Sequence, residues 1–371
     1  MNITSIETIP INVPIHQDKA TVGGRGVHRE SPFLVVQVHT SEGITGLGEV
    51  SCTPLWSGED QFTAAHFIQN LLAPLLIGRN PLEAGRLTDL MSRTLANNPF
   101  TRAGIEMALW DIAGKAANVP VHSLLGGTVR DSVRTKYSVS GLEPRKAAAI
   151  AHWAVEQGFT AMKVKVGMDP ETDLARVRAV RDAIGPDILL GIDANGGWNP
   201  ATAIRMLAPL DALGIAFVEQ PVPAGDPRWL ARVRSASTMP VVADESLSTA
   251  TDALSLLGNE AADMFSIYVG MGGGLREAMN VSSVAAAARV PCAIGSNLEL
   301  GIAQAAMIHL GLSQPAIQPD VIPSDIISCF FYERDIIQEP LPVRGGIADR
   351  IDAPGLGVTL DMEAVNRFRV G

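Results

Sequence analysis

Five short motifs recur at a nearly constant interval through the middle of this 371-residue chain, and apolar runs precede them. Their reference residues are Lys163, Asp193, Glu219, Asp244 and Tyr268. The intervals are 30 (193−163), 26 (219−193), 25 (244−219) and 24 (268−244) residues. One strand, one helix and two short loops fit such an interval. Its repetition therefore predicts a parallel sheet with right-handed crossovers.

The segments between the motifs support this pattern. Short apolar runs predict strands at 162–166, 188–193, 217–220, 241–244, 264–269 and 292–295. Amphipathic runs predict helices at 174–183, 201–213 and 274–287. Continued through eight units, this α/β pattern predicts a (β/α)8-type TIM barrel. An open doubly wound sheet is the alternative. It is disfavoured because no Gly-x-Gly-x-x-Gly follows the first strand and because polar residues end nearly every strand.

The first third of the chain has a different pattern, typical of an α+β domain. A β-rich run at 33–38 and turn signals on both sides of a short second strand predict paired strands. Helical patterns follow at 61–76, 81–95 and 101–117. The last forty or so residues contain short strands and turns, and we expect them to pack back on this first domain.

Charge and composition exclude several classes of partner. The net charge of −10 argues against nucleic acid and against anionic membrane surfaces. No uncharged apolar run approaches the length of a membrane span, and the N-terminus lacks the pattern of a secretory signal. The three cysteines are far apart, which implies no disulfide framework. The predicted location is the cytoplasm.

Three of the motifs end in carboxylates, at Asp193, Glu219 and Asp244. Strand C-termini converge on one mouth of a barrel, so these side chains are expected to meet. Three hard oxygen ligands without histidine or cysteine suit Mg²⁺, with Mn²⁺ as the other cation of this kind. The alternative is that each acid caps a helix or makes a surface pair, which does not explain their common position and spacing.

Lys163 and Lys165 are two positions apart on a strand, so both side chains point to one face. In a barrel strand this face is the interior. Burial and like charge both disfavour the protonated forms, so we expect the two amines to lower each other's pKa until one acts as a base. Two lysines on a solvated strand edge are the alternative, which fits poorly with the apolar residues around them.

These motifs together resemble those of the enolase superfamily, specifically the muconate lactonizing enzyme branch of the mandelate racemase and muconate lactonizing enzyme family. The likeness covers almost the whole chain. It rests on Lys163-x-Lys165, Asp193-x-Asn195, Glu219-Gln220-Pro221, Asp244-Glu245-Ser246 and, near the domain junction, residues 108–112, 114–115 and 124–127. The resemblance implies an N-terminal capping domain at 1–125, a barrel at 126–330 and a C-terminal segment at 331–371 that completes the cap.

The resemblance also implies the chemistry. Asp193, Glu219 and Asp244 would bind Mg²⁺, and Lys165 would abstract the proton α to a substrate carboxylate through a metal-stabilised enediolate. Lys163 would tune Lys165 and touch the substrate carboxylate. A small carboxylate substrate and a homo-oligomeric assembly are the expected partners.

The sixth strand departs from the family pattern. Branch members read Asp-x-x-Asn-x-Lys there, whereas this chain has Ser266 and Tyr268 at the Asn and Lys positions. No lysine follows Lys165, and no histidine lies between His152 and His309 that could serve instead. Tyr268 is expected to act as a hydrogen-bond donor or acid, as a true second base, or as packing only.

Substrate recognition is expected from the first domain and from the mouth of the barrel. The candidates are Arg25, His28 and Arg29 in a glycine-rich loop, Trp56, and Asn195, Ser296, Asn297 and Glu299. The sequence Gln318-Pro319-Asp320 departs from the paired-aspartate motif of dipeptide epimerases, which argues against a dipeptide amine as substrate.

One amine base predicts one-sided chemistry, because Lys165 alone can serve both proton transfers. We therefore expect a lactonising cycloisomerisation, as in muconate cycloisomerases, or a dehydration. An epimerase or racemase that uses Lys165 and Tyr268 on opposite faces is the alternative. A non-catalytic metal-binding scaffold is the hypothesis from another class.

Overall fold

Seven parallel strands form the central sheet of the structure, a computed structural model that describes residues 1–371 apart from the side chain of Gln17. The strand order is β13-β12-β11-β10-β9-β8-β7, so strands that follow one another in sequence lie side by side. The strands are β7 (Tyr137–Val139), β8 (Ala161–Lys165), β9 (Leu189–Asp193), β10 (Val218–Glu219), β11 (Val241–Ala243), β12 (Met264–Ile267) and β13 (Cys292–Ile294). The predicted parallel α/β sheet is confirmed.

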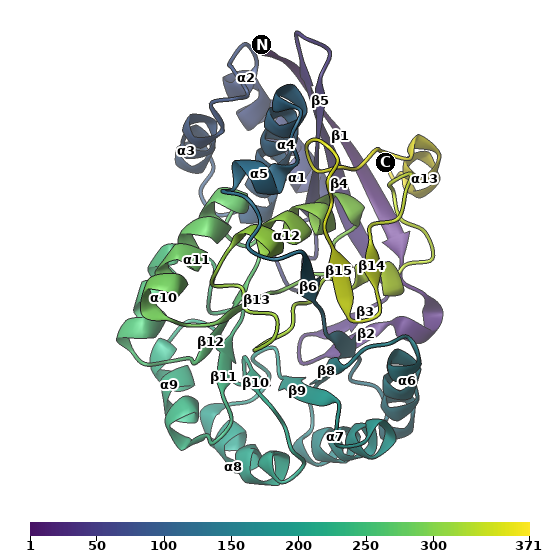
Figure 1. Cartoon of the computed structure of the whole chain (residues 1–371), viewed down its shortest axis with the longest axis vertical. Coiled ribbons are helices and arrows are strands. Elements are labelled where there is room, and N and C mark those ends of the chain that lie inside the picture. Colours follow the sequence, from purple (N-terminus) through teal and green to yellow (C-terminus); the bar gives the residue numbers. More distant parts are fainter.

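Helices connect the strands and lie around the outside of the curled sheet (Figure 1). They are α6 (Pro144–Glu156), α7 (Pro170–Ile184), α8 (Pro200–Asp211), α9 (Pro227–Ala236), α10 (Ala250–Gly258), α11 (Leu275–Ala288) and α12 (Gly301–Ser313). Helices α7, α8 and α9 start at a proline. In each case the preceding Asp169, Asn199 or Asp226 accepts a hydrogen bond from a backbone N–H of the first turn, which defines the helix start.

A short irregular segment around Ser324 joins the two edge strands of this sheet. Ser324 accepts a backbone hydrogen bond from Lys136 and donates one to Arg134, next to β7. On the other side, the N–H of Asp325 donates to the carbonyl of Ile294 on β13. The segment therefore lies where an eighth strand would lie, although it has no regular strand of its own.

The N-terminal part contains an antiparallel sheet of β1 (Ile3–Pro14), β4 (Glu30–Thr40) and β5 (Thr45–Ser51), with a hairpin of β2 (Thr21–Gly23) and β3 (Gly26–His28). Its helices are α1 (Gln61–Phe67), a π-helical stretch Ile68–Leu72, α2 (Ala73–Leu76), α3 (Ala84–Thr94) and α4 (Pro99–Ala117). Helix α3 starts three residues later than predicted, because Asn80 accepts two N–H bonds that form a turn there.

Two buried glutamates of this part bind the starts of α11, which connects β12 to β13, and of α12, which follows β13. Glu49 on β5 accepts the N–H groups of Leu300 and Ala303 at the start of α12. Glu106 on α4 accepts the N–H groups of the first two residues of α11. Burial raises the pKa of Glu49 to about 8 and that of Glu106 to about 7, although the backbone donors oppose the shift. The helix dipole and the free N–H groups favour a carboxylate at both places.

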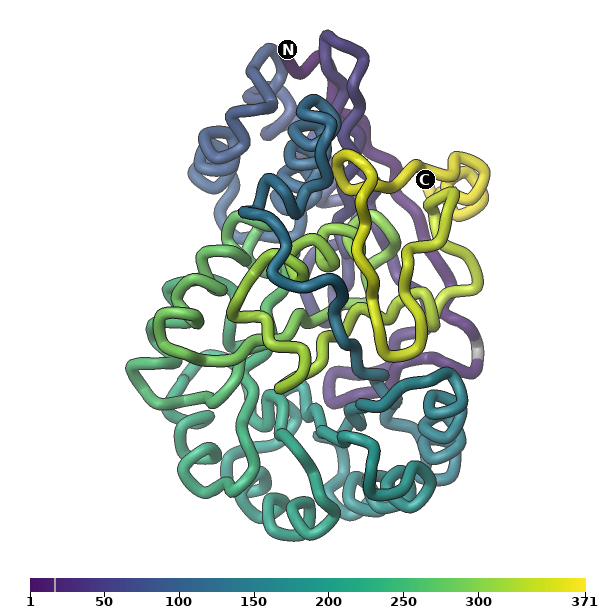
Figure 2. The backbone as a smooth tube through the Cα atoms, viewed as in Figure 1, coloured from purple at the N-terminus to yellow at the C-terminus, as the bar shows by residue number. Residues whose placement is uncertain are grey.

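The last segment returns to both parts of the molecule (Figure 2). It contains a 3₁₀ turn at Ser328–Phe330, β14 (Val343–Arg344), β15 (Ile347–Asp349) and α13 (Met362–Phe368). Strand β15 pairs with β6 (Ser132–Arg134), which follows the short helix α5 (Val121–Leu124). The N–H of Val370 donates to the carbonyl of Pro10 on β1.

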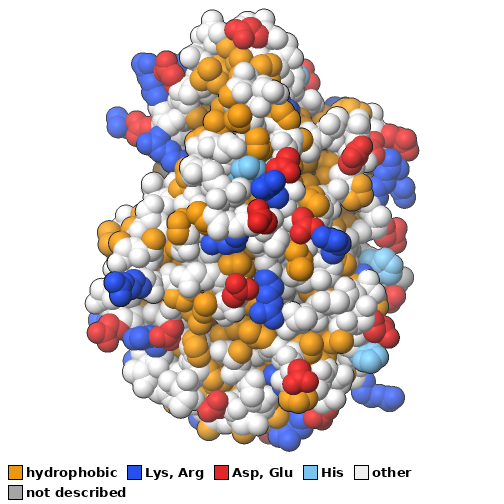
Figure 3. Space-filling model, in the orientation of Figure 1, with side chains coloured by type: hydrophobic (Ala, Val, Ile, Leu, Met, Phe, Trp, Pro, Cys, Tyr) orange, Lys and Arg blue, Asp and Glu red, His pale blue; other side chains and the backbone are white. Residues whose placement is uncertain are grey.

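The surface carries charges of both signs. On the face drawn in Figure 3, basic and acidic side chains are interspersed and form no large patch of one sign. Among the helices that the structure describes, none combines the length and the apolar character needed to cross a membrane.

Candidate active site

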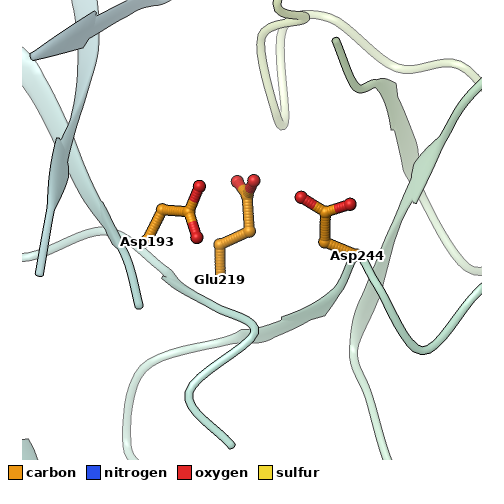
Figure 4. A group of neighbouring side chains, drawn as sticks. All are labelled: Asp193, Glu219 and Asp244. Carbon is orange, nitrogen blue, oxygen red and sulfur yellow. The ribbon is translucent and has the colours of Figure 1, made fainter. Parts of the chain in front are cut away.

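Three carboxylates meet at the C-terminal ends of neighbouring strands. Asp193 ends β9, Glu219 ends β10 and Asp244 follows β11 directly, and all three are completely buried. One oxygen from each can be chosen so that all three lie within 4.8 Å of one another. Figure 4 shows the three side chains side by side. The parallel register of β9, β10 and β11 produces this meeting point from residues about 25 positions apart.

Their hydrogen bonding fits a hard cation. Oε2 of Glu219 and Oδ1 of Asp244 are buried and have no hydrogen-bond partner among the described residues. Burial raises the pKa of Glu219, and that of Asp244 to well above its usual value; neighbouring carboxylates add to both shifts, and Lys163 opposes them. Buried acceptors without donors are costly, and a divalent cation would satisfy both oxygens. The oxygen-only donor set suits Mg²⁺ or Mn²⁺.

The side chain of Gln220 fixes two of the ligand-bearing strand ends relative to each other. Its Oε1 accepts the backbone N–H groups of Asp244 and Ser246, at 3.0 and 3.2 Å. Its Nε2 donates to Ser246 Oγ and to the carbonyl of Val222, both at 2.8 Å. Gln220 adopts a φ of 34°, in the left-handed region, so this arrangement is maintained against backbone strain.

Lys163 lies on one side of the carboxylates in the sheet interior. Its Nζ is 2.5 Å from Glu219 Oε1, 3.0 Å from Asp325 Oδ2 and 3.3 Å from Asp193 Oδ2. Burial lowers the pKa of Lys163, but these carboxylates outweigh burial and raise the pKa well above its usual value. The mutual lowering that the sequence predicted is therefore wrong for Lys163, because its nearest charged groups are acids.

Lys165 is held on the same strand, closer to solvent. Its Nζ is 2.7 Å from Asp193 Oδ2 and 2.8 Å from Asn195 Oδ1, and its side chain is 13% exposed. Burial would raise the pKa of Asp193, but Lys165 and Lys163 outweigh it and lower this pKa below its usual range. Asp193 therefore carries its negative charge between the two lysines. Lys165 is thus the amine nearest to the open side of the site.

The structure adds a third lysine and a fourth inner carboxylate that the sequence interpretation missed. Lys136, directly before β7, is completely buried and lies 3.0 Å from Asp325 Oδ2, the atom that Lys163 also contacts. The acid at the eighth strand position is therefore Asp325. Asp320, in the sequence Gln318-Pro319-Asp320, is exposed and lines a separate surface depression. The sequence signal available for Lys136 was a charged residue directly before the short β-prone segment Tyr137–Val139.

Tyr268 lies immediately after β12 on the other side of the carboxylates. Its hydroxyl donates to Asp244 Oδ2 at 3.1 Å, and its ring lies 5.1 Å from that of Trp56 at an interplanar angle of 33°. Burial raises the pKa of Tyr268 well above its usual value, and Asp244 and its neighbours add to the shift. The side chain is 5% exposed, so the phenol is a neutral donor fixed on a carboxylate.

Glu245 joins the N-terminal part to the strand ends. Its Oε1 accepts from Asn195 Nδ2 at 3.0 Å and from Trp56 Nε1 at 3.3 Å, and it lies 3.5 Å from Nε of Arg25. Arg25 also donates to the carbonyls of Asn195 and Trp56, both at 3.4 Å. The loops that carry Arg25 and Trp56, both from the first part of the chain, thus contact the same acidic side chain, Glu245, next to Asp244.

A cavity of about 820 Å³, which includes space open to solvent, lies above Lys163 and Lys165. Of the predicted substrate-binding residues, those in its wall are Arg25, His28, Trp56, Asn195, Ser296 and Asn297. Arg29 is exposed and outside this wall, because alternate residues of the β3 hairpin point to opposite sides. Glu299 lies beneath it and accepts from Ser296 and Asn297. Apolar parts of the wall come from Leu55, Leu298, Ile327 and Phe331.

The β2–β3 hairpin covers this cavity. Val22 exchanges hydrogen bonds with the segment after β7, through Ser140 Oγ at 2.8 Å and the N–H of Gly141 at 2.7 Å. A Cβ at Gly24 would lie 2.8 Å from the carbonyl oxygen of Ala194, so the hairpin backbone contacts the loop after β9 directly. The hairpin therefore limits the access of water to Lys165.

Two family models match the chain over most of its length. Residues 5–126 match the mandelate racemase / muconate lactonizing enzyme N-terminal domain, and residues 146–365 match the enolase C-terminal domain-like model. Muconate cycloisomerase 1 of Rhodococcus opacus is 32% identical over 99% of this chain and 98% of that protein.

Solved structures are similar as well. That of the N-succinyl Arg/Lys racemase from Bacillus cereus superposes with a TM-score of 0.95 at 30% identity, covering 100% of this chain and 99% of that one. The dipeptide epimerase from Cytophaga hutchinsonii, in complex with Mg and the dipeptide D-Ala-L-Val, gives 0.93 at 30% identity, with 99% and 98% covered.

Proposed function

Since the chain belongs to the mandelate racemase and muconate lactonizing enzyme family of the enolase superfamily, we propose that it removes the proton α to the carboxylate of a small organic acid, with Mg²⁺ as cofactor. It is an isomerase-type enzyme, as its relatives are. The observation that carries the proposal is the buried carboxylate triad with a part-exposed lysine beside it. The experiment that tests it is α-proton exchange in D₂O, followed by NMR over a panel of carboxylic acids with Mg²⁺ present.

The proposed architecture is a (β/α)8-type barrel at 126–330 with an α+β capping domain at 1–125. The backbone bonds of Ser324 beside β7 and of Asp325 to β13 link both edges of the sheet and support closure. The third segment, 331–371, would complete the cap, which agrees with the bond between Val370 and Pro10. Self-association and a cytoplasmic location stay predictions.

Asp193, Glu219 and Asp244 are the proposed ligands, for Mg²⁺ or alternatively Mn²⁺. A bound divalent cation would supply positive charge against the substrate carboxylate and so stabilise the negative charge that develops as the α-proton leaves. Lys163 would donate to the same carboxylate, because its ammonium already lies among the ligand oxygens. Lys165 would accept the α-proton, and Asn195 orients its amine.

The proposed reaction is one-sided, either a lactonising cycloisomerisation or a dehydration. The group opposite Lys165 is a neutral phenol that donates to Asp244 and packs against Trp56. Such a phenol is poorly suited to accept a proton, whereas Lys165 can both remove the α-proton and return it to the same face.

Replacing Tyr268 by phenylalanine tests this proposal. We expect kcat to fall by about tenfold or less, because only one hydrogen bond to Asp244 is lost, which is about 1.4 kcal/mol. The measurement is kcat with the acid that shows the fastest α-proton exchange. A fall of three or more orders of magnitude, together with a product of inverted α-configuration from the parent enzyme, supports a Lys165/Tyr268 epimerase instead.

Epimerisation is the second candidate because epimerases and cycloisomerases are both among the similar proteins. The configuration of the product at the α-carbon distinguishes the two. A metal-binding scaffold without catalysis is the third hypothesis. It would be favoured if no acid of the panel exchanged its α-proton while Mg²⁺ was bound.

The substrate is proposed to carry a second polar or anionic group at the cap end of the cavity. Arg25 and His28 line this end, and His28 is held by Ser31 Oγ at 2.6 Å. Burial lowers the pKa of His28, which disfavours its charged form, and Arg25, 3.5 Å from Glu245, is the cation that lines this end. A ligand-bound structure without contacts to these residues would contradict this assignment.

Replacing Gly24 by alanine tests whether the hairpin must close on the loop after β9. The added methyl group would lie 2.8 Å from the carbonyl oxygen of Ala194 when the hairpin is placed as in this structure, and Gly24 has no positive φ that would itself disfavour alanine. We expect kcat/KM to fall by about tenfold or more, since overpacking costs about 1–3 kcal/mol. The control is Gly258→Ala, where a Cβ has open space. Equal kcat/KM values for both variants would show that closure is not needed.

A further inference from the structure

The inner charges of the site form a chain that extends beyond the proposed ligands. Asp325 Oδ2 lies 3.0 Å from both Lys136 Nζ and Lys163 Nζ, and Lys163 Nζ lies 2.5 Å from Glu219 Oε1. Lys136 also donates to the carbonyl of Pro323 at 2.6 Å, so its ammonium is fixed. The charges therefore alternate from Lys136 through Asp325 and Lys163 to the ligand carboxylates.

This chain is shielded from solvent. Lys136 is 0% exposed, and the side chains of Lys163 and Asp325 are 5% and 4% exposed. Water screens charges poorly in such surroundings, so the removal of one of them changes the potential at the ligand oxygens. Ion pairs on the surface are screened by water, so their removal changes the potential at the ligand oxygens much less.

The count of inner charges is informative. Four carboxylates and three lysines give −4 + 3 = −1; they are Asp193, Glu219, Asp244, Asp325, Lys136, Lys163 and Lys165. A divalent cation brings this sum to +1, which a substrate with one carboxylate neutralises. Glu245 is left out because it is paired with Arg25.

We propose that Lys136 and Asp325 are positioning residues that set the cation affinity of the site through Lys163. Asp325 shares the Lys163 ammonium with the ligand carboxylates Glu219 and Asp193, and Lys136 compensates the charge of Asp325. Without Asp325, Lys163 would be left to Glu219 and Asp193 and would compete with the cation. Without Lys136, Asp325 would attract Lys163 more strongly and free the ligand oxygens. This inference rests on the proposed cation site.

Two substitutions should therefore shift Mg²⁺ binding in opposite directions. We expect Asp325→Asn to raise the Kd for Mg²⁺ and Lys136→Met to lower it, each by on the order of tenfold for one buried unit charge. The double variant restores the sum of −1 and should return the Kd to within about threefold of the parent. The directions of these two Kd shifts do not depend on the protonation state of Lys165.

The measurement is isothermal titration of the metal-free full-length protein with MgCl₂, with thermal unfolding of each variant as a check of folding. The control is Lys115→Met, which removes the lysine partner of the buried Asp111, 2.6 Å away in the first part of the chain, and should leave the Kd unchanged. If Lys136→Met does not fold, the effect of losing Lys136 is read from the Kd of the double variant compared with that of Asp325→Asn. The Kd for Mg²⁺ should be lower in the double variant.

The outcomes separate the two proposals. If the parent protein binds no Mg²⁺, the proposed cation site is wrong. If it binds Mg²⁺ and the two single variants shift the Kd in the same direction or not at all, only the role of Lys136 and Asp325 is wrong. Opposite shifts with recovery in the double variant support it, because loss of packing alone weakens binding in both.

Discussion

Replacement of Lys165 by alanine is expected to lower kcat by on the order of 10³- to 10⁴-fold, or about 4–5 kcal/mol of activation free energy. Lys165 is the amine nearest to the open side of the site, and Asn195 and Asp193 hold its Nζ at 2.8 and 2.7 Å. Lys163 and Lys136 are less exposed, with side chains 5% and 0% exposed against 13% for Lys165, so they lie deeper among the buried carboxylates. The fold should survive, since the side chain is part-exposed.

The decisive measurement is α-proton exchange in D₂O, because it reports proton abstraction even where no product forms. Lys165→Ala should lose exchange while it keeps stoichiometric Mg²⁺. Lys146→Ala, an exposed lysine of α6, is the matched control and should retain full activity. Exchange that persists in Lys165→Ala but disappears in Tyr268→Phe would assign the base to the phenol.

Substitutions of the three carboxylates are expected to abolish activity through loss of the cation. Asp193→Asn, Glu219→Gln and Asp244→Asn each replace an anionic ligand by a neutral amide of similar shape. We expect each variant to lose stoichiometric Mg²⁺ in metal analysis by mass spectrometry. Asp320→Asn, at an exposed position, is the control. Retention of stoichiometric Mg²⁺ by all three ligand variants would contradict the assignment.

Thermal unfolding of the metal-free variants should differ between two of these positions. Burial raises the folded pKa of Asp244 above its unfolded value, so its charge lowers stability at pH 7 and Asp244→Asn should not lower Tm. Lys165 and Lys163 outweigh burial and lower the folded pKa of Asp193, so that carboxylate stabilises at pH 7 and its contribution is lost as pH falls. Asp193→Asn should therefore lower Tm.

Added Mg²⁺ gives a second readout on the same samples. A cation that binds only the folded state stabilises it by about 2.7 kcal/mol at 100 times its Kd. The parent protein should show this increase in Tm, and the three ligand variants should not. An increase of the same size in Asp244→Asn would mean that the cation binds elsewhere.

The sequence was sufficient for the carboxylates and for Lys163 and Lys165 because their positions follow from local patterns. The carboxylates directly follow apolar residues at strand ends, the two lysines alternate with Val164 on one strand, and parallel strands bring these strand ends together. The family and the parallel α/β sheet are confirmed for the same reason. The roles of the predicted site residues stay predictions until variants are measured.

Lys136 and Asp325 could not be predicted in the same way, because their burial depends on how the sheet closes. The strand after Lys136 is three residues long, and Asp325 lies in a segment without a regular strand. No short-range periodicity indicates which side chain of such segments points inward. The direction of the Lys163 pKa shift was missed for this reason, since Asp325 is the carboxylate that contributes most to it.

The helix starts held by Glu49 and Glu106 limit how this architecture can be recombined. Each glutamate comes from the first part of the chain, while the N–H groups that it binds come from helices far along the sequence. A chimera that joined this cap to the barrel of a relative would bury two carboxylates without donors unless the starts of α11 and α12 were compatible. Exchange of specificity between relatives by grafting whole caps should therefore require that these acids and helix starts be transferred together, whereas grafting the β2–β3 hairpin alone leaves both contacts intact.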